Sequence, residues 1–127
     1  MNLGEFALLE DWEAEDVWGL PGVIQIMPIA SLDAHLDLPF LSERLPYDLT
    51  PRQVMSDPHS HMGEYSRMWL ADDFPIDIVQ HPIHGHFVIL DGLHRLMRAA
   101  FMGRRAVRVR VISWVDFKKI SRGKSTV

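Results

Sequence analysis

The sequence predicts a single α+β domain in which helices flank a small sheet. The main observation is the stretch 87–112, which reads as an apolar strand, a glycine turn, an amphipathic helix and a second strand. Runs of β-branched and apolar residues at 23–27 and 76–79 predict two more strands. A chain of 127 residues has the length of one domain with a substantial core.

The helices are predicted from their ends and their apolar faces. A first helix is expected within residues 1–20 and ends at the Leu-Pro-Gly of 20–22. Ser31 caps a possible one-turn helix. Thr50 and Pro51 are typical of a helix start, because threonine caps a free N–H and proline at the first helical position loses no hydrogen bond. A further helix is expected over 61–70, and its side chains at 62, 68 and 69 are expected to lie in the core.

The helix after Gly92 is the clearest element. Gly103 suits its C-terminal end, and one face carries Leu93, Leu96, Met97, Ala100 and Phe101. In the strand that follows, valines at 107, 109 and 111 alternate with Arg108 and Arg110. This period predicts one buried face and one solvated, basic face. Residues 81–86 are predicted to form the turn of a hairpin, and prolines at 39 and 46 indicate an irregular connection over 37–48.

Three regions follow from composition. Residues 1–22 form an acidic N-terminal segment, 23–113 the domain, and 114–127 a basic C-terminal tail, of which 118–127 is expected to fray. Residues 1–90 carry 15 acidic and 3 basic side chains, whereas 91–127 carry 2 acidic and 10 basic ones. Such blocks can attract each other within one fold, or the basic block can bind phosphates or nucleic acid.

Composition also limits the chemistry. The chain has no cysteine, so disulfides, thiolate metal sites and thiol catalysis are excluded. No apolar run approaches the roughly 20 residues of a membrane span, and the N-terminus lacks the pattern of a signal peptide. We therefore expect a cytoplasmic protein with no membrane partner.

The turn after the apolar strand, with Asp91, Gly92, Leu93, His94 and Arg95, is the candidate functional site. A helix that begins at a glycine directly after a strand presents free backbone N–H groups and the positive end of its dipole, which suits an anion. A cation in the first turn is disfavoured unless an anion is nearby, and arginine offers a planar fork for phosphate oxygens. The alternative is that Arg95 pairs with one of the many acidic residues.

The run Phe-Val-Ile-Leu-Asp-Gly-Leu-His-Arg at 87–95, its helix ending in glycine and the strand at 107–112 resemble the ParB/sulfiredoxin superfamily. Residues 23–29 are similar to its first strand, 74–79 to its Pro-Ile-x-Val strand, and 50–52 to a segment of bacterial ParB-like proteins. The resemblance covers about 23–113 and is specific over 74–112. It implies a compact ParB/sulfiredoxin-like domain with a small mixed sheet and flanking helices.

In that superfamily the turn binds nucleotide phosphates, and members include sulfinic-acid reductases, free-serine kinases, nucleases and CTP-dependent partition proteins. The resemblance implies that Gly92 and the N–H groups of Leu93, His94 and Arg95 hold phosphate, with ATP, ADP or CTP and Mg²⁺ as the expected ligands. Sulfiredoxins carry a cysteine where this chain has Leu93, which excludes their chemistry. A complete partition protein is not expected, because the chain ends soon after the last strand.

The remaining roles stay open. Asp91 could cap the turn, or it could hold Mg²⁺ or accept a substrate proton, with His94 as a second catalytic candidate. Glu43 and Asp48 are the nearest candidates for a kinase-type base. Arg52 could cap its own helix region or approach the phosphate turn.

Five of the seven histidines fall between residues 59 and 86. Imidazoles bind Zn²⁺ or Ni²⁺ well, but the spacing matches no firm metal motif, so we expect solvated loop histidines and assign no metal site.

The leading functional prediction is a nucleotide- or phosphate-binding domain, with phosphotransferase or nucleotide hydrolase activity as its enzymatic form. A second hypothesis is a non-enzymatic regulatory or DNA-binding accessory module that uses the arginine-rich face. The arginines of this face are Arg98, Arg104, Arg105, Arg108 and Arg110. Acidity of the whole chain counts against DNA binding. A third hypothesis is a protein-interaction platform in which the chain's own Asp or Glu side chains occupy the phosphate turn.

Overall fold

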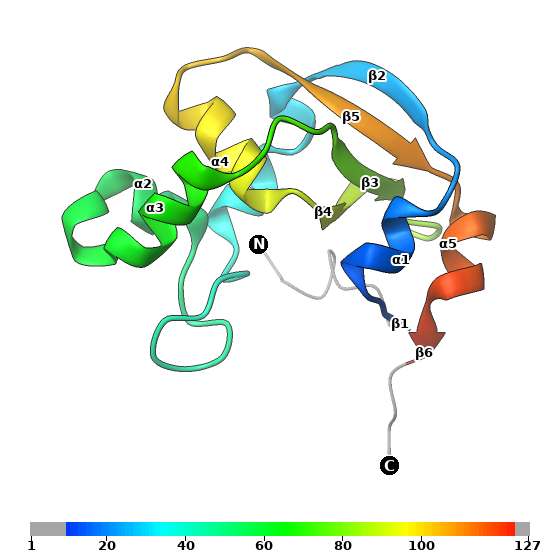
Figure 1. Ribbon diagram of the computed structural model, residues 1–127, viewed down its shortest axis with the longest axis horizontal. Helices are drawn as coiled ribbons and strands as arrows, with labels where there is room; N and C mark the ends of the chain where they lie inside the picture. The colour runs from blue at the N-terminus through cyan, green and yellow to red at the C-terminus, as the bar shows by residue number, and fades with distance from the viewer. Residues whose placement is uncertain (1–9, 124–127) are drawn as a thin grey trace.

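The computed structural model describes residues 10–123, and it is a compact α+β domain (Figure 1). In chain order, the helices and strands are β1 Glu10–Asp11, α1 Ala14–Trp18, β2 Val23–Pro28, α2 Pro51–Ser56, α3 Met62–Leu70, β3 Ile76–Gln80, β4 Phe87–Asp91, α4 Leu93–Phe101, β5 Ala106–Ile112, α5 Trp114–Ile120 and β6 Arg122–Gly123. Short 3-10 helices occupy Ile29–Ser31 (η2), Asp33–Asp37 (η3) and Pro58–His61 (η4).

The main sheet has four strands in the order β2-β5-β3-β4. β2 runs antiparallel to β5, β3 runs parallel to β5, and β3 and β4 form an antiparallel hairpin. The sheet is therefore mixed, and the predicted hairpin is confirmed. β1 and β6 pair separately as an antiparallel ribbon.

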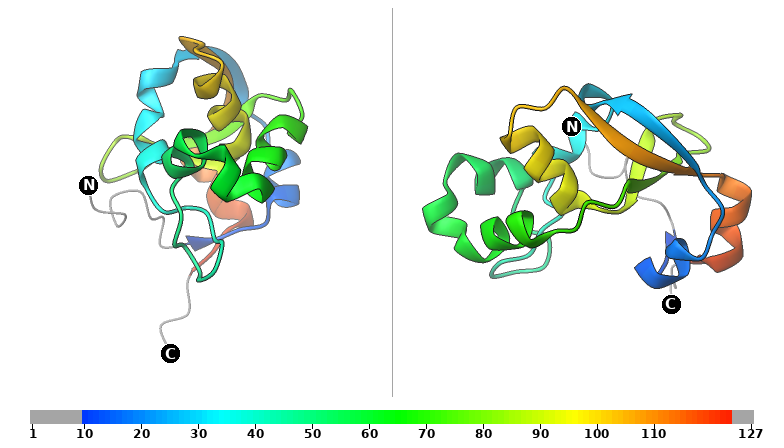
Figure 2. Two further views of the ribbon diagram at one scale, coloured as in Figure 1. Left: turned by 90° about the vertical axis from the view of Figure 1, so that its left-hand side faces the viewer. Right: turned by 45° about the horizontal axis from the view of Figure 1, so that its top comes forward.

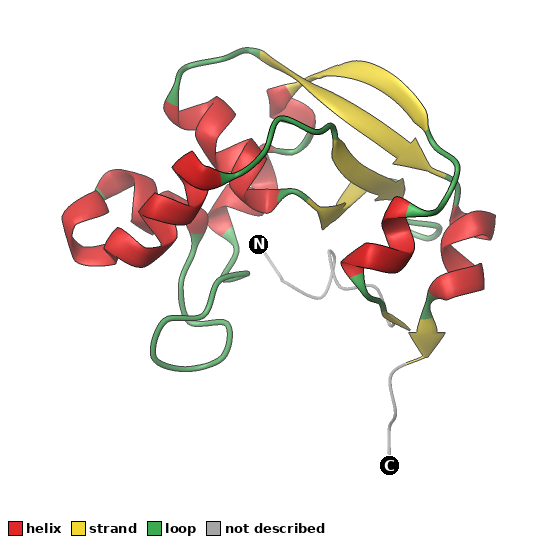
Figure 3. Cartoon of the chain, in the orientation of Figure 1, coloured by secondary structure: helices red, strands yellow, loops and turns green. Residues whose placement is uncertain are grey.

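Helices cover the sheet from two sides (Figure 3). In both views of Figure 2, α4 lies with α2 and α3, whereas α1 lies with α5. Alternate residues of β3 and β4 therefore face different cores. Ile76 and Ile78 of β3 belong to the core beneath α4, and Val79 belongs to the core beneath α1 and α5.

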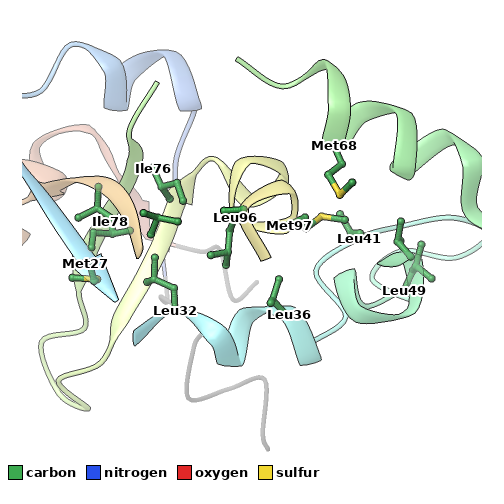
Figure 4. Packing of buried hydrophobic residues seen from close by; sticks show 14 residues of the cluster. Met27, Leu32, Leu36, Leu41, Leu49, Met68, Ile76, Ile78, Leu96 and Met97 are labelled. Carbon is green, nitrogen blue, oxygen red and sulfur yellow. The ribbon is translucent and has the colours of Figure 1, made fainter. Parts of the chain in front are cut away.

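The larger core joins α4 to the sheet, α2, α3 and the 3-10 helices (Figure 4). Leu96 and Met97 of α4 are fully buried, as is Met68 of α3. The buried stripe of α4 differs slightly from the predicted one, because Ala99 is buried while Phe101 is 40% exposed. Phe101 packs edge-on against the aromatic rings of α3 instead.

The second core contains Val17 of α1 and Phe117 of α5, both fully buried against the sheet. The indole Nε1 of Trp12 donates a hydrogen bond to the Leu90 carbonyl at 3.0 Å. Its ring meets Phe117 edge-on at 5.5 Å between centroids. Residues before β2 and after β5 thus help to cover one face of the sheet, and α5 is a helix that the sequence pattern did not identify.

Three local expectations are wrong. Ser31 ends η2 and caps no helix. Of the side chains at 62, 68 and 69, only Met68 is buried, while Met62 and Trp69 are 51% and 42% exposed. Arg110 is not on a solvated face, because its guanidinium binds Asp77 at 2.7 Å and the Val17 carbonyl at 2.8 Å.

The expectation that the tail frays is wrong for 118–123, because α5 extends to Ile120 and β6 pairs with β1, and 124–127 lie outside the described residues. The predicted start of α2 is confirmed. α2 starts with Thr50 as its cap and Pro51 at its first position, and Thr50 and Gln53 form a capping box.

Among the helices of residues 10–123, none combines the length and apolar character needed to cross a membrane.

Candidate functional site

The candidate site is the turn between β4 and α4. Gly92 has φ 112° and ψ 23°, a backbone conformation that L side chains rarely adopt. A Cβ at this position would lie 3.0 Å from Arg95 Nη1 and 3.3 Å from the Ile76 Cα. Glycine is therefore required by both the dihedral angle and the close approach of β3.

The turn leaves two backbone N–H groups at the start of α4 available to a ligand. The amides of Arg95 and Leu96 donate to the Gly92 carbonyl at 3.0 and 3.1 Å. Within residues 10–123, no backbone carbonyl accepts from the amides of Leu93 or His94. These two N–H groups lie at the positive end of the helix dipole, the arrangement that binds phosphate in other proteins.

Arg95 lies across the turn and is 12% exposed. Its Nε contacts Asp72 Oδ1 at 2.8 Å, its Nη1 donates to the Pro75 carbonyl at 3.0 Å, and its Nη2 lies 3.5 Å from Asp91 Oδ2. The same Asp91 oxygen accepts a hydrogen bond from the Trp18 indole at 2.8 Å. Of the two roles considered for Arg95, the structure shows the pairing with acidic residues. Arg95 ties the turn to the segment before β3.

His94 forms a second contact of the turn, with a carboxylate of α3. Its Nε2 lies 2.6 Å from Glu64 Oε2, and the other Glu64 oxygen binds Arg67 at 3.1 Å. The Glu64 side chain is 11% exposed and that of His94 is 28% exposed. With Nε2–H donating to Glu64, the Nδ1 of His94 is the nitrogen left to accept a proton.

Glu64 and Asp72 were not among the predicted site residues. Glu64 lies four positions before the buried Met68, on the same face of α3. A carboxylate on the apolar face of a predicted helix needs a partner, and this signal could have identified Glu64. Asp72 carries no such signal, because its contact with Arg95 depends on how α3 and α4 are placed.

The structure places the candidate bases Glu43 and Asp48 in the loop between η3 and α2. Asp48 accepts hydrogen bonds from the amides of Leu45, Glu43 and Arg44 at 2.9, 2.8 and 3.0 Å. These bonds lower the pKa of Asp48 and organise the loop. Glu43 Oε2 contacts His61 Nδ1 at 2.5 Å. Asp48 therefore binds the amides of its own loop, and Glu43 binds His61 of η4.

Arg52 likewise binds acidic neighbours. Its Nε contacts Asp37 at 2.7 Å and its Nη2 lies 3.4 Å from Asp33. The hydrogen bond from Arg52 lowers the pKa of Asp37. Arg52 therefore joins α2 to η3 in this structure, and its expected approach to the phosphate turn is not observed.

The histidines are more structural than expected. His81 is 7% exposed, and its Nδ1 accepts the amides of Ile83 and His84 at 3.1 and 3.2 Å. Rings 81, 84 and 86 lie with centroids 4.7–5.8 Å apart. The expectation of solvated loop histidines is thus wrong for His81. In residues 10–123 no group of three metal-ligating side chains is found.

His35 is also structural. It is 2% exposed, its Nδ1 donates to the Leu32 carbonyl, and its Nε2 accepts the Ile89 amide. Burial lowers its pKa to about 4, so this histidine joins η3 to β4 in its neutral form.

The arginines of the predicted basic face divide into two groups. Arg98 binds Asp73 at 2.9 Å and donates to the carbonyls of residues 71 and 72, and the half-buried Arg110 binds Asp77 and the Val17 carbonyl of α1. Arg104, Arg105 and Arg108 are exposed. Only part of the predicted face is therefore available to a ligand.

A scan against protein-family models gives no match, and searches of curated proteins and of solved structures give none either.

Proposed function

We propose that the chain is a ParB/sulfiredoxin-like domain that binds a nucleotide or another phosphorylated ligand at the turn 91–95. The observation that carries the proposal is the left-handed Gly92 at the start of α4, with the free amides of Leu93 and His94 beside it. The chain order of strand, glycine turn, helix and strand supports the finer fold assignment.

The charges around the turn predict that Mg²⁺ assists binding. Glu64, Asp72 and Asp91 surround the turn, and the two arginines that contact them, Arg67 and Arg95, balance only two of the three carboxylate charges. A phosphate placed beside them would be repelled. Mg²⁺ is commonly held by one or two carboxylates together with substrate phosphates, and Asp72 and Asp91 are suited to this because both already meet at Arg95. The expected ligands are thus ATP, ADP or CTP with Mg²⁺.

The pair formed by His94 and Glu64 supports an enzymatic form of this function. A carboxylate that holds one imidazole nitrogen fixes the ring and stabilises its protonated form. Nδ1 of His94 would then take the proton from a water molecule or an acceptor hydroxyl as its oxygen attacks the terminal phosphorus. The bond from that phosphorus to the bridging oxygen breaks, and the nucleotide with one phosphate fewer leaves with the negative charge on that oxygen. Phosphoryl transfer needs mainly positioning and charge neutralisation beyond this.

The proposal is tested by titrating the full chain with ATP, ADP and CTP, each with Mg²⁺ and with EDTA. A nucleotide present at 100 times its Kd stabilises the folded state by about 2.7 kcal/mol, so the melting temperature should rise clearly. Asp91→Asn, which removes one of the two proposed Mg²⁺ ligands, should weaken binding at least tenfold. Asp57→Asn is the matched control, because Asp57 is exposed and lies between α2 and η4, outside the turn 91–95. Absence of binding by every nucleotide would refute the proposal.

A second candidate function, the protein-interaction platform, is favoured by one observation. The cationic side chains of the turn already bind the chain's own carboxylates, Arg95 to Asp72 and His94 to Glu64. In this alternative Arg95→Ala reduces stability, and MgATP shifts the melting temperature of neither the variant nor the wild type.

The DNA-binding alternative has less support, because Arg98 and Arg110 make intramolecular contacts. It remains testable by a gel shift at low salt, where phosphate contacts are strongest.

A further inference from the structure

A pocket of about 350 Å³ lies beside α4, away from the amides of the phosphate turn. Its walls come from the segment 72–76, the flank of α4, the start of β5 and Ile26 of β2. Hydrogen bonds from Arg98 and Arg108 to residues 71–73 hold this segment against α4 and β5. In Figure 1 the segment 72–76 is seen in the connection between α3 and β3.

Four arginines line the pocket, and two of them are neutralised. Arg95 pairs with Asp72 at 2.8 Å and Arg98 pairs with Asp73 at 2.9 Å. Both guanidinium groups are nearly buried, with 12% and 16% of their side chains exposed. They form a fixed wall of the pocket that carries little net charge.

The other two arginines, Arg104 and Arg108, are exposed and have no carboxylate partner among residues 10–123. One nitrogen of Arg108, Nη2, donates to the Asp73 carbonyl at 2.9 Å. That bond orients the guanidinium at the pocket and leaves its other N–H groups available. Guanidinium groups bind carboxylates and phosphates through paired hydrogen bonds, so the pocket rim carries two cations suited to an anion.

Apolar side chains line the same pocket. Ile26 is 77% exposed and Phe74 is 70% exposed, and Val107 and Ala99 form part of the wall between them and the arginines. Exposed large apolar side chains that gather in a concave site with convergent polar groups are typical of ligand pockets. The volume lies near the lower end of the range of about 300–1,000 Å³ for such sites, which indicates a small ligand.

The geometry points to a second binding site, which takes a small organic anion with an apolar body. Arg104 and Arg108 bind its carboxylate or phosphate group, and Ile26 and Phe74 contact its aliphatic or aromatic part. This site shares the Arg95–Asp72 pair with the turn as part of its wall, but its proposed ligand contacts come from Arg104, Arg108, Ile26 and Phe74, so its binding can be measured separately from that of the nucleotide site.

The test uses phenyl phosphate and benzoate as probes on the full chain, followed by calorimetry and by amide NMR shifts. Inorganic phosphate and benzyl alcohol represent the head group and the apolar body alone. We expect phenyl phosphate or benzoate to bind at least tenfold more tightly than inorganic phosphate and benzyl alcohol. Comparison of phenyl phosphate with benzoate shows whether the site prefers a phosphate or a carboxylate. The double variant Arg104→Ala, Arg108→Ala should weaken that binding at least tenfold.

Arg105→Ala is the matched control, because Arg105 is exposed and adjacent to Arg104 but does not line the pocket. It should leave binding within twofold of the wild type. An equal loss in Arg105→Ala would overturn the inference in favour of general attraction to the basic surface, including that of nucleic acid. Probe-induced NMR shifts confined to the amides of Leu93 and His94 would assign the probe to the turn, and absence of binding by both aromatic anions would also overturn the inference.

Discussion

Replacing Gly92 with alanine tests the geometry of the turn. At φ 112° the alanine side chain strains the backbone, at a cost of about 1–2 kcal/mol. The new Cβ would lie 3.0 Å from Arg95 Nη1 and 3.3 Å from the Ile76 Cα, so these neighbours must give way by a few tenths of an ångström, which disturbs the bond from Nη1 to the Pro75 carbonyl. Loss of one hydrogen bond from a charged group costs about 1.5–3 kcal/mol. We expect Gly92→Ala to lower the free energy of unfolding by about 2.5–5 kcal/mol.

Chemical denaturation followed by circular dichroism measures this change, and two other glycines serve as controls. Gly85 and Gly103 also have positive φ, 78° and 73°, but no atom lies within 4 Å of a Cβ added to either. Their alanine variants should lose only the backbone strain, about 1–2 kcal/mol. Equal losses in all three variants would show that the close approach of Ile76 and Arg95 to Gly92 has no energetic effect, and would refute the reasoning.

Other changes test the surrounding contacts. Arg110→Met removes the cation from Asp77, whose side chain is 6% exposed, and should cost about 3–5 kcal/mol in chemical denaturation. A change below 1 kcal/mol would contradict this. Burial lowers the pKa of His35 from 6.5 to about 4, so the unfolded chain binds the proton more readily. Stability from this group is therefore complete above pH 6.5 and declines by about 3 kcal/mol as the pH falls to 4. His35→Gln should flatten this pH dependence, and an unchanged slope would exclude His35 as its source. Asp48→Ala should speed amide hydrogen exchange at 43–45 and leave MgATP affinity unchanged, whereas lost affinity would make Asp48 part of the site.

The elements that the sequence predicts well are those with local signals. Thr50 and Pro51 start α2 as expected because capping depends on neighbours within one turn. Gly92 identifies the start of α4, because glycine adopts the positive φ of this turn more readily than any other residue. Alternation in β5 likewise identifies the strand before its partners are known.

Contacts between distant segments could not be predicted in this way. The alternating pattern of β5 places Arg108 and Arg110 on the same face of the strand. Only the packing of α1 distinguishes them, because α1 partly covers Arg110. α5 is short, and Phe117 is its single fully buried residue. Its polar and basic residues therefore give no apolar pattern from which a packed helix could be predicted. Tertiary packing decides both cases.

The candidate site divides in the same manner. Asp91, Gly92, His94 and Arg95 are brought together by one turn, so the sequence locates them. Their partners Glu64 and Asp72 come from α3 and the segment that follows it, 30 positions before His94 in the case of Glu64. Which acidic residue reaches the turn therefore depends on how α3 packs against α4.

An amide NMR titration of the full chain with MgATP tests the central claim most directly, because it reports on the individual backbone donors of the turn. The account predicts that the resonances of Leu93 and His94 shift most, that the shifts saturate, and that EDTA abolishes them. If those two resonances stay unchanged at saturating MgATP, or if the shifts are confined to Arg104, Arg105 and Arg108, the turn is not a nucleotide site.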